Sequence, residues 1–142
     1  MIVLTQCVGS KRTQPCEAQQ LYQSLLFDAQ RQYAKCMGDR WYILSAEHGL
    51  VHPETVLEPY DTFIDDVDTD TWADEVTTSL PEAETIVFTA GSKYATPIIE
   101  RLDECVNTRE PFSGLGIGER VKEMYKQVDS QQHKTLDEYA TG

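Results

Sequence analysis

The amino-acid sequence predicts a single-domain α/β fold, a Rossmann-like three-layer sandwich with a small, mainly parallel sheet of about four strands. Short apolar segments alternate along the chain with longer segments whose apolar residues recur at helical spacing. The apolar segments show little polar alternation, which is typical of strands buried on both faces of a parallel sheet. A chain of 142 residues also has the length of one domain.

The first half of the chain contains two predicted strands and one long predicted helix. The segment IVLT at residues 2–5 predicts a buried strand, which runs into the polar loop QCVGSK. Residues 18–36 carry apolar side chains every three or four positions and end at the sequence MGD, which predicts a helix. The segment WYILSA at residues 41–46 predicts the second strand.

A helix and a third strand are expected after a long polar loop. Asp70 or Thr71 is the expected N-cap of this helix, and Pro81 follows its end. The segment TIVFTA at residues 85–90 then predicts the third strand. Strands and helices thus alternate as in a βαβ unit.

The last third of the chain adds a helix, a weaker strand and a final helix. Pro97 is expected in or near the first turn of the earlier helix, because proline cannot donate a backbone hydrogen bond. A fourth strand is expected near residues 105–108, before the glycine-rich segment GLGIG and the last helix. We therefore expect an α/β domain over residues 1–130, and a polar tail or loosely attached helix over residues 131–142.

The formal net charge is −12, from 24 acidic and 12 basic side chains. Two explanations are open: a halophilic source, where acidic side chains keep a protein solvated at high salt, or a cationic partner. The spread of acidic residues along the chain favours the halophilic source. No lysine or arginine occurs in residues 41–92, which carry 12 of the 24 acidic residues. Any phosphate-binding surface must therefore use the two ends of the chain.

The four cysteines form no C-x-x-C pair, so we expect free thiols in a reducing cytoplasm and no metal site. The N-terminal segment MIVLTQCV lacks the charged start and the long apolar run of a signal peptide, and no segment has the length of a membrane span. These observations predict a cytoplasmic protein with no membrane partner.

The polar loops that follow the predicted strands are expected to meet. In a parallel sheet with right-handed crossovers, such loops emerge at one edge, where open sheets bind ligands. In this chain they hold the segments QCVGSK, AEHGLVHPE with EPYD, GSKY, and GLGIG. We therefore expect one site at this edge.

The first of these loops supplies candidate reactive groups. Ser10 and Lys11 offer a hydroxyl and a cation to an anionic or carbonyl oxygen. Nearby positive charge would also favour the thiolate of Cys7 and make it a nucleophile. The alternative is a buried cysteine beside an exposed lysine.

The second loop supplies a candidate acid or base and an aromatic residue. His48 is a candidate because imidazole titrates near neutral pH. In EPYD, Tyr60 can stack on a base, and Asp61 can accept hydrogen bonds from a base or a ribose. The alternative is a tyrosine that packs on the sheet beside an aspartate that caps a turn.

The last two loops resemble phosphate-binding turns. In GSKY, Ser92 is an expected helix N-cap, and Lys93 lies beside the positive end of the helix. The glycines of GLGIG would let a phosphate approach the backbone, although the segment is not the G-x-G-x-x-G motif. Helix capping alone is the alternative explanation.

Together, the segments CVGSK, LYQSLLF, ILSAEHGL, EPYD, TAGSKY and SGLGIG resemble a family of short domains in the YaaA-like superfamily, from about residue 1 to residue 128. YaaA proteins are linked to peroxide stress and DNA binding. A domain of archaeosine synthase, which modifies a deazaguanine base in tRNA, is distantly similar. The resemblance implies nucleobase or nucleic-acid chemistry. The positions that match the family pattern are Cys7, Lys11, Tyr22, Ser45, His48, Gly49, Pro59, Tyr60, Asp61, Gly91, Tyr94, Gly114 and Gly116.

We therefore expect a protein that acts on or binds a nucleobase or nucleotide, with nucleic acid as a further candidate partner and no cofactor assigned. The expected catalytic residues are Cys7, Lys11, His48 and Asp61. The expected ligand-binding residues are Ser10, Ser45, Tyr60, Gly91, Ser92, Lys93, Tyr94, Gly114 and Gly116.

Two alternatives to an enzyme are open. One is a non-catalytic accessory or stress-response protein that binds nucleic acid. A protein of net charge −12 can do this only by concentrating its few cations on one face. The other is a sensor of small nucleotides that performs no chemistry.

Overall fold

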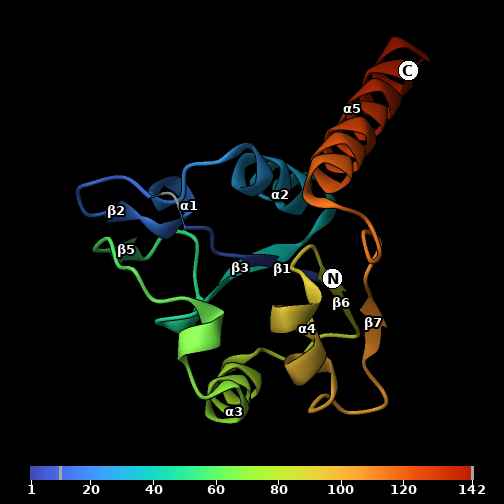
Figure 1. Cartoon of the computed structure of the whole chain (residues 1–142). Coiled ribbons are helices and arrows are strands. Elements are labelled where there is room, and N and C mark those ends of the chain that lie inside the picture. The colour runs from blue at the N-terminus through green and yellow to red at the C-terminus, as the bar shows by residue number, and fades with distance from the viewer. Residues whose placement is uncertain (10, 142) are drawn as a thin grey trace.

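A five-stranded, mostly parallel sheet forms the centre of the molecule (Figure 1). The computed structural model describes residues 1–9 and 11–141, with side chains up to residue 132. The strand order is β4-β3-β1-β6-β7, in which β1, β3, β6 and β7 are parallel and β4 runs antiparallel to β3. The strands are β1 (Ile2–Gln6), β3 (Arg40–Ser45), β4 (Gly49–Val51), β6 (Thr85–Phe88) and β7 (Asn107–Arg109).

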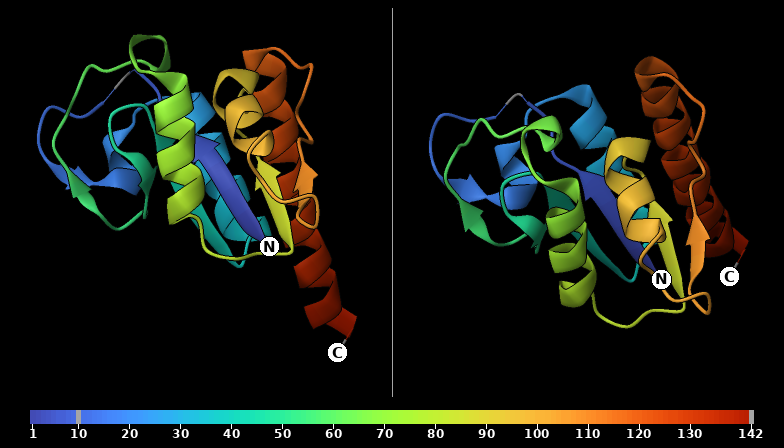
Figure 2. Two further views of the ribbon diagram at one scale, coloured as in Figure 1. Left: turned by 90° about the horizontal axis from the view of Figure 1, so that it is seen from below. Right: turned by 60° about the horizontal axis from the view of Figure 1, so that its bottom comes forward.

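Helices cover both faces of this sheet. Figure 2 shows α3 and α4 on the near side of the strands and α2 and α5 behind them. This distribution follows from right-handed crossovers, because the chain moves one way from β1 to β3 and the other way from β3 to β6 and β7. The helices are α2 (Leu25–Met37), α3 (Thr69–Ser79), α4 (Ser92–Ile99) and α5 (Ile117–Thr141).

The central strand β1 is buried on both faces, as its apolar sequence predicts. Val3 belongs to a core with Tyr33 of α2 and Met124 of α5. Leu4 points the other way, into a core with Trp72 of α3 and Ile98 of α4. The sequence-based prediction of a mainly parallel sheet with buried strands is therefore confirmed.

The predicted helix over residues 18–36 is divided in two. A single turn, α1 (Ala18–Leu21), ends because Tyr22 has extended backbone and forms an antiparallel bridge with Lys11. A new helix, α2, begins after Ser24, whose Oγ accepts a hydrogen bond from the Phe27 N–H at 3.0 Å. The prediction of one continuous helix was wrong at this break, because the helical spacing of apolar residues continues across it.

Two short pieces of sheet were not predicted. The antiparallel strand β4 follows β3 after a tight turn and supplies the fifth strand, and the turn ends at Gly49, which has a φ of +74° that favours glycine. Outside the main sheet, β2 (Cys16–Glu17) pairs antiparallel with β5 (Val56–Leu57). The predicted number of about four strands was therefore one too few for the main sheet.

Several predicted boundaries moved by a few residues. Asp68, rather than Asp70 or Thr71, caps α3, and its carboxylate accepts hydrogen bonds from the N–H groups of those two residues. Pro97 was expected in or near the first turn of α4, and it lies in the turn that follows the first, because the helix begins at Ser92. Strand β7 covers Asn107–Arg109 rather than residues 105–108.

The final helix α5 continues to Thr141, through the segment that was expected to be a polar tail or a loosely attached helix. Figures 1 and 2 show that its C-terminal part extends beyond the rest of the fold. Within the described ranges, no helix is both long and apolar enough to cross a lipid bilayer.

Candidate functional site

The strand order marks one edge of the sheet as the place for a ligand. From β1 the chain crosses to β3 on one side, whereas β6 lies on the other side of β1. The loops that follow β1 and β6 therefore diverge at the carboxyl edge, and such a switch point is where open α/β sheets bind ligands. Most of the predicted site residues lie in the loops at this edge.

Three tyrosines form the centre of this edge, and two of them meet at Ser45, the last residue of β3. The Tyr60 hydroxyl lies 2.7 Å from Ser45 Oγ and 2.5 Å from Tyr22 Oη. Ser45 Oγ also accepts a hydrogen bond of 3.1 Å from the His48 N–H. One strand end therefore positions the loops that carry His48 and Tyr60.

The third tyrosine connects this network to Cys7. The Tyr94 hydroxyl lies 3.3 Å from Cys7 Sγ, and both residues are buried. The Tyr94 ring packs edge-to-face with the Trp72 ring at 5.7 Å, and Trp72 Nε1 donates to the Ser45 carbonyl at 2.8 Å. We refer to Cys7, Tyr22, Ser45, Tyr60 and Tyr94 as the tyrosine cluster.

Lys11 and His48 flank the tyrosine cluster. The Lys11 ammonium lies 4.4 Å from the centre of the Tyr60 ring, a cation–π contact, and donates to the Gly9 carbonyl at 3.3 Å. The exposed His48 ring lies perpendicular to the Tyr60 ring at 5.2 Å. A cation and an imidazole thus border one aromatic ring.

Burial keeps the three phenols of the cluster neutral. It raises the pKa of Tyr22 to about 12. Burial, followed by the proximity of Cys7, also raises the pKa of Tyr60 and Tyr94 well above the usual value. At neutral pH these hydroxyls can donate hydrogen bonds to a ligand but cannot act as phenolate bases.

A cavity of about 340 Å³ lies beside the cluster, between the N-terminal ends of α4 and α5. Gly91, Lys93 and Arg120 contribute polar lining, whereas Leu26 and Leu115 contribute an apolar surface. Tyr94 lines the same cavity. We call this cavity the α4–α5 pocket.

Arg120 is the cation best placed in the α4–α5 pocket. It is half-buried, and no acidic side chain among the described residues pairs with it. A Cβ atom at Gly91 would lie 3.6 Å from Arg120 Nη1, so the guanidinium lies close to the start of α4. Lys93, by contrast, forms an ion pair of 2.9 Å with Asp65.

Two glutamines that the sequence analysis missed hold this pocket in place. Gln6 Oε1 accepts a hydrogen bond of 2.6 Å from the Gly91 N–H. Gln30, which is fully buried, accepts from the Gln6 N–H at 2.9 Å and from Thr89 Oγ1 at 2.7 Å. The sequence carried a signal for Gln30, since this polar residue falls on the apolar side of its helix. A buried amide there needs hydrogen-bond partners.

The structure brings together most, but not all, of the predicted site residues. Cys7, Lys11, Ser45, His48, Tyr60 and Tyr94 are connected through the cluster, and Gly91, Ser92, Lys93, Tyr94 and Gly116 line the α4–α5 pocket. Asp61 is exposed and forms no hydrogen bond with any described residue. Gly114 does not line the pocket, and Ser10 lies outside the described residues.

The start of α4 differs from its prediction. Ser92 is the first residue of α4 and Gly91 is its N-cap, so the predicted capping role of Ser92 was wrong. Among the described residues, no three His, Cys, Asp or Glu side chains are grouped as metal ligands.

The fold and the site define an α/β protein with a polar site at the carboxyl edge of a mostly parallel sheet. Residues 2–126 match the model of a family of unknown function, DUF6884, and the chain belongs to this family. No curated protein and no solved structure matches the chain. The family match contains no link to YaaA proteins or to archaeosine synthase.

Proposed function

We propose that this protein is a Rossmann-like nucleotide-binding protein that acts on its ligand at the carboxyl edge of the sheet. The phosphate would occupy the α4–α5 pocket, and the base or ribose would lie against the tyrosine cluster. One observation carries this proposal. Tyr94 lines the pocket, while its hydroxyl lies 3.3 Å from Cys7 Sγ, so a single ligand can contact the pocket and the cluster.

The α4–α5 pocket has the chemistry that a phosphate requires. Arg120 supplies a guanidinium that lacks a carboxylate partner among the described residues, and such a group can bind two phosphate oxygens. The starts of α4 and α5 add backbone N–H groups and the positive ends of two helix dipoles. The volume of about 340 Å³ is within the range of small-molecule sites.

The tyrosine cluster supports contact with a base or a sugar. Its neutral hydroxyls offer hydrogen bonds of fixed direction, because Ser45 and Tyr22 hold the Tyr60 hydroxyl from two sides. Lys11 and His48 add a cation and an acid or base at its margin. The resemblance of these loops to the YaaA-like superfamily is in keeping with a nucleobase ligand.

A second candidate function is a nucleotide sensor without chemistry. The burial of Cys7 favours this candidate, because the residue is only 6% exposed and its Sγ contacts the Tyr94 hydroxyl. The His48 ring is exposed, so His48 is the better candidate for a role in turnover.

Titration with nucleobases, nucleosides and nucleoside monophosphates tests the proposal. Arg120→Ala should weaken nucleotide binding at least tenfold and leave nucleobase binding unchanged, since only the phosphate contact is lost. Lys126→Ala, which removes one exposed charge further along α5, is the matched control. Calorimetric titration measures both affinities. Equal losses in the two variants, or no nucleotide binding by the wild-type protein, would contradict the proposal.

A second pair of variants separates the shape of the pocket from its charge. In Gly91→Ala the new Cβ would lie 3.2 Å from Gln6 Oε1 and would crowd the pocket, whereas Gly118→Ala meets nothing within 4 Å. Only the first should weaken nucleotide binding. With a ligand identified, loss of turnover in His48→Ala at unchanged affinity identifies an enzyme, and absence of turnover in the wild-type protein identifies a sensor.

A further inference from the structure

A second cavity, of about 420 Å³, is lined mainly by the loop that follows β1, Lys11 included. Its lining consists of residues 11–16 and Gln23, and we call it the loop pocket. Lys11 and Arg12 are among these residues, whereas no acidic residue is. This is unusual for a chain in which acidic residues outnumber basic ones by 24 to 12.

Arg12 is held in place while its charged end stays available. Its Nε donates to the Gln20 carbonyl at 2.9 Å, and its backbone N–H donates to the Leu21 carbonyl at 2.8 Å. Neither terminal guanidinium nitrogen hydrogen-bonds to another described residue. A guanidinium anchored through Nε keeps two parallel N–H donors for an oxyanion.

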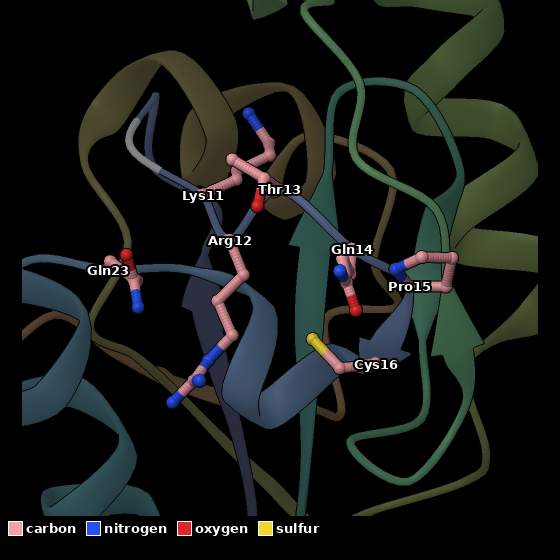
Figure 3. A pocket seen from close by; sticks show the side chains of 7 residues that line it. All are labelled: Lys11, Arg12, Thr13, Gln14, Pro15, Cys16 and Gln23. Atoms are coloured by element: carbon pink, nitrogen blue, oxygen red, sulfur yellow. The ribbon is translucent and has the colours of Figure 1, made fainter.

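The rest of the lining adds neutral donors. Figure 3 shows the Arg12 side chain between Gln23 on one side and Gln14 and Cys16 on the other, with Thr13 above it. Side-chain amides and hydroxyls donate hydrogen bonds to phosphate oxygens without adding negative charge. The larger cavity of about 520 Å³ near Glu82, Glu84 and Asp103 has the opposite character and would repel an anion.

We infer that the loop pocket is a binding subsite for a phosphate-type oxyanion, with Arg12 as its principal ligand. The subsite is separate from the α4–α5 pocket, because the two cavities share no lining residue. It adjoins the tyrosine cluster, since Lys11 lines the loop pocket and its ammonium lies 4.4 Å from the Tyr60 ring centre. The oxyanion is either free phosphate or a phosphate ester carried by a small molecule.

Backbone amide resonances followed by NMR test this inference during titration with inorganic phosphate at constant ionic strength. The Thr13 and Gln14 amides should shift and saturate. Arg12→Ala should weaken this response at least tenfold, whereas Lys126→Ala and Arg120→Ala should leave it unchanged. Gln23→Ala, an exposed position, should weaken it less and serves as a second variant that leaves the Nε anchor intact.

Titration with a nucleoside 3′,5′-bisphosphate, which carries one phosphate for each pocket, distinguishes the two sources of the oxyanion. Shifts in the loop pocket and the α4–α5 pocket with one common midpoint indicate one phosphorylated ligand that reaches both. Loop-pocket shifts with inorganic phosphate alone indicate free phosphate. The inference is overturned if the Thr13 and Gln14 amides do not saturate with either compound, or if Arg12→Ala and Lys126→Ala weaken the response equally.

Discussion

Tyr60 contacts four other residues of the candidate site. Its hydroxyl joins Ser45 to Tyr22, its ring carries the Lys11 ammonium on one side, and the His48 ring packs against it. Because burial raises the pKa of this phenol, the hydroxyl stays protonated in the folded protein. The residue therefore organises the site as a neutral donor and aromatic surface.

The tyrosine cluster makes the protein sensitive to alkaline pH. A folded-state pKa above the unfolded value gives stability that is present below the unfolded pKa, near 10, and lost as pH rises toward the folded pKa. Each such tyrosine lowers the free energy of unfolding by up to about 1.4 kcal/mol per pH unit above about pH 10. Tyr22, Tyr60 and Tyr94 all act in this direction.

Tyr60→Phe should therefore reduce this alkaline loss. At pH 8 the variant should be less stable than the wild type by about 1–2 kcal/mol, because Ser45 and Tyr22 lose a partner. Between about pH 10 and 11.5 the free energy of unfolding of the variant should fall less steeply with pH than that of the wild type. The difference in slope should correspond to about one proton, because one phenol no longer ionises on unfolding. Urea denaturation across this range measures both effects. An unchanged slope would contradict a raised pKa for Tyr60.

The packing of α2 against α5 depends on a polar contact as well as on apolar burial. The Tyr125 hydroxyl donates to Asp28 Oδ2 at 2.5 Å, and Arg31 and Gln32 donate to the same carboxylate at 2.6 and 2.8 Å. Burial alone would raise the pKa of Asp28, but these three hydrogen bonds outweigh it and lower the pKa. Since α5 also lines the α4–α5 pocket, this contact helps to position Arg120.

Tyr125→Phe should destabilise the protein at neutral pH by about 1 kcal/mol. A lowered folded-state pKa gives stability that is present above the unfolded pKa, near 4, and lost as pH falls through the folded value. The difference in the free energy of unfolding between the wild type and the variant should therefore become smaller at acid pH. A double-mutant cycle with Asp28→Asn, followed by urea denaturation at pH 7 and pH 3, measures the coupling. If the two substitutions changed the free energy of unfolding additively at pH 7, the coupling between Tyr125 and Asp28 would be refuted.

The parts of the fold that follow from periodicity could be predicted, and the parts that depend on distant partners could not. The apolar segments at β1, β3 and β6 gave the parallel sheet, because strands buried on both faces need no local context. The break between α1 and α2 was missed because Tyr22 leaves the helix to meet Tyr60, which lies 38 positions away. Strand β4 was missed because three residues are too few for a periodic signal.

The same distinction applies to the candidate site. The loops at the carboxyl edge could be identified from the alternation of predicted strands and helices along the chain. The roles of Gln6 and Gln30 depend on hydrogen bonds between β1, α2 and the loop after β6, which no local pattern encodes. Arg120 gains its place because α5 returns to the edge after β7. The proximity of distant elements, rather than any motif, therefore completed the pocket.

The charge of the whole molecule should make its stability depend on salt. With a net charge of −12, repulsion among surface carboxylates opposes the folded state at low ionic strength. Salt shortens the Debye length from about 10 Å at 0.1 M to about 3 Å at 1 M and so weakens this repulsion. Salt also weakens exposed ion pairs such as Lys93–Asp65, but these contribute at most about 1 kcal/mol each.

We therefore expect the Tm to rise by about 5–10 °C between 0.05 and 1 M potassium chloride. A variant with Glu58, Glu104 and Glu110 replaced by glutamine provides the control, because all three side chains are exposed. It should be more stable than the wild type at low salt and respond less to added salt, since fewer charges repel. Calorimetry of both proteins across the series measures the two slopes. A Tm that falls with salt would show that ion pairs outweigh repulsion, and it would favour a cationic partner as the reason for the acidic surface.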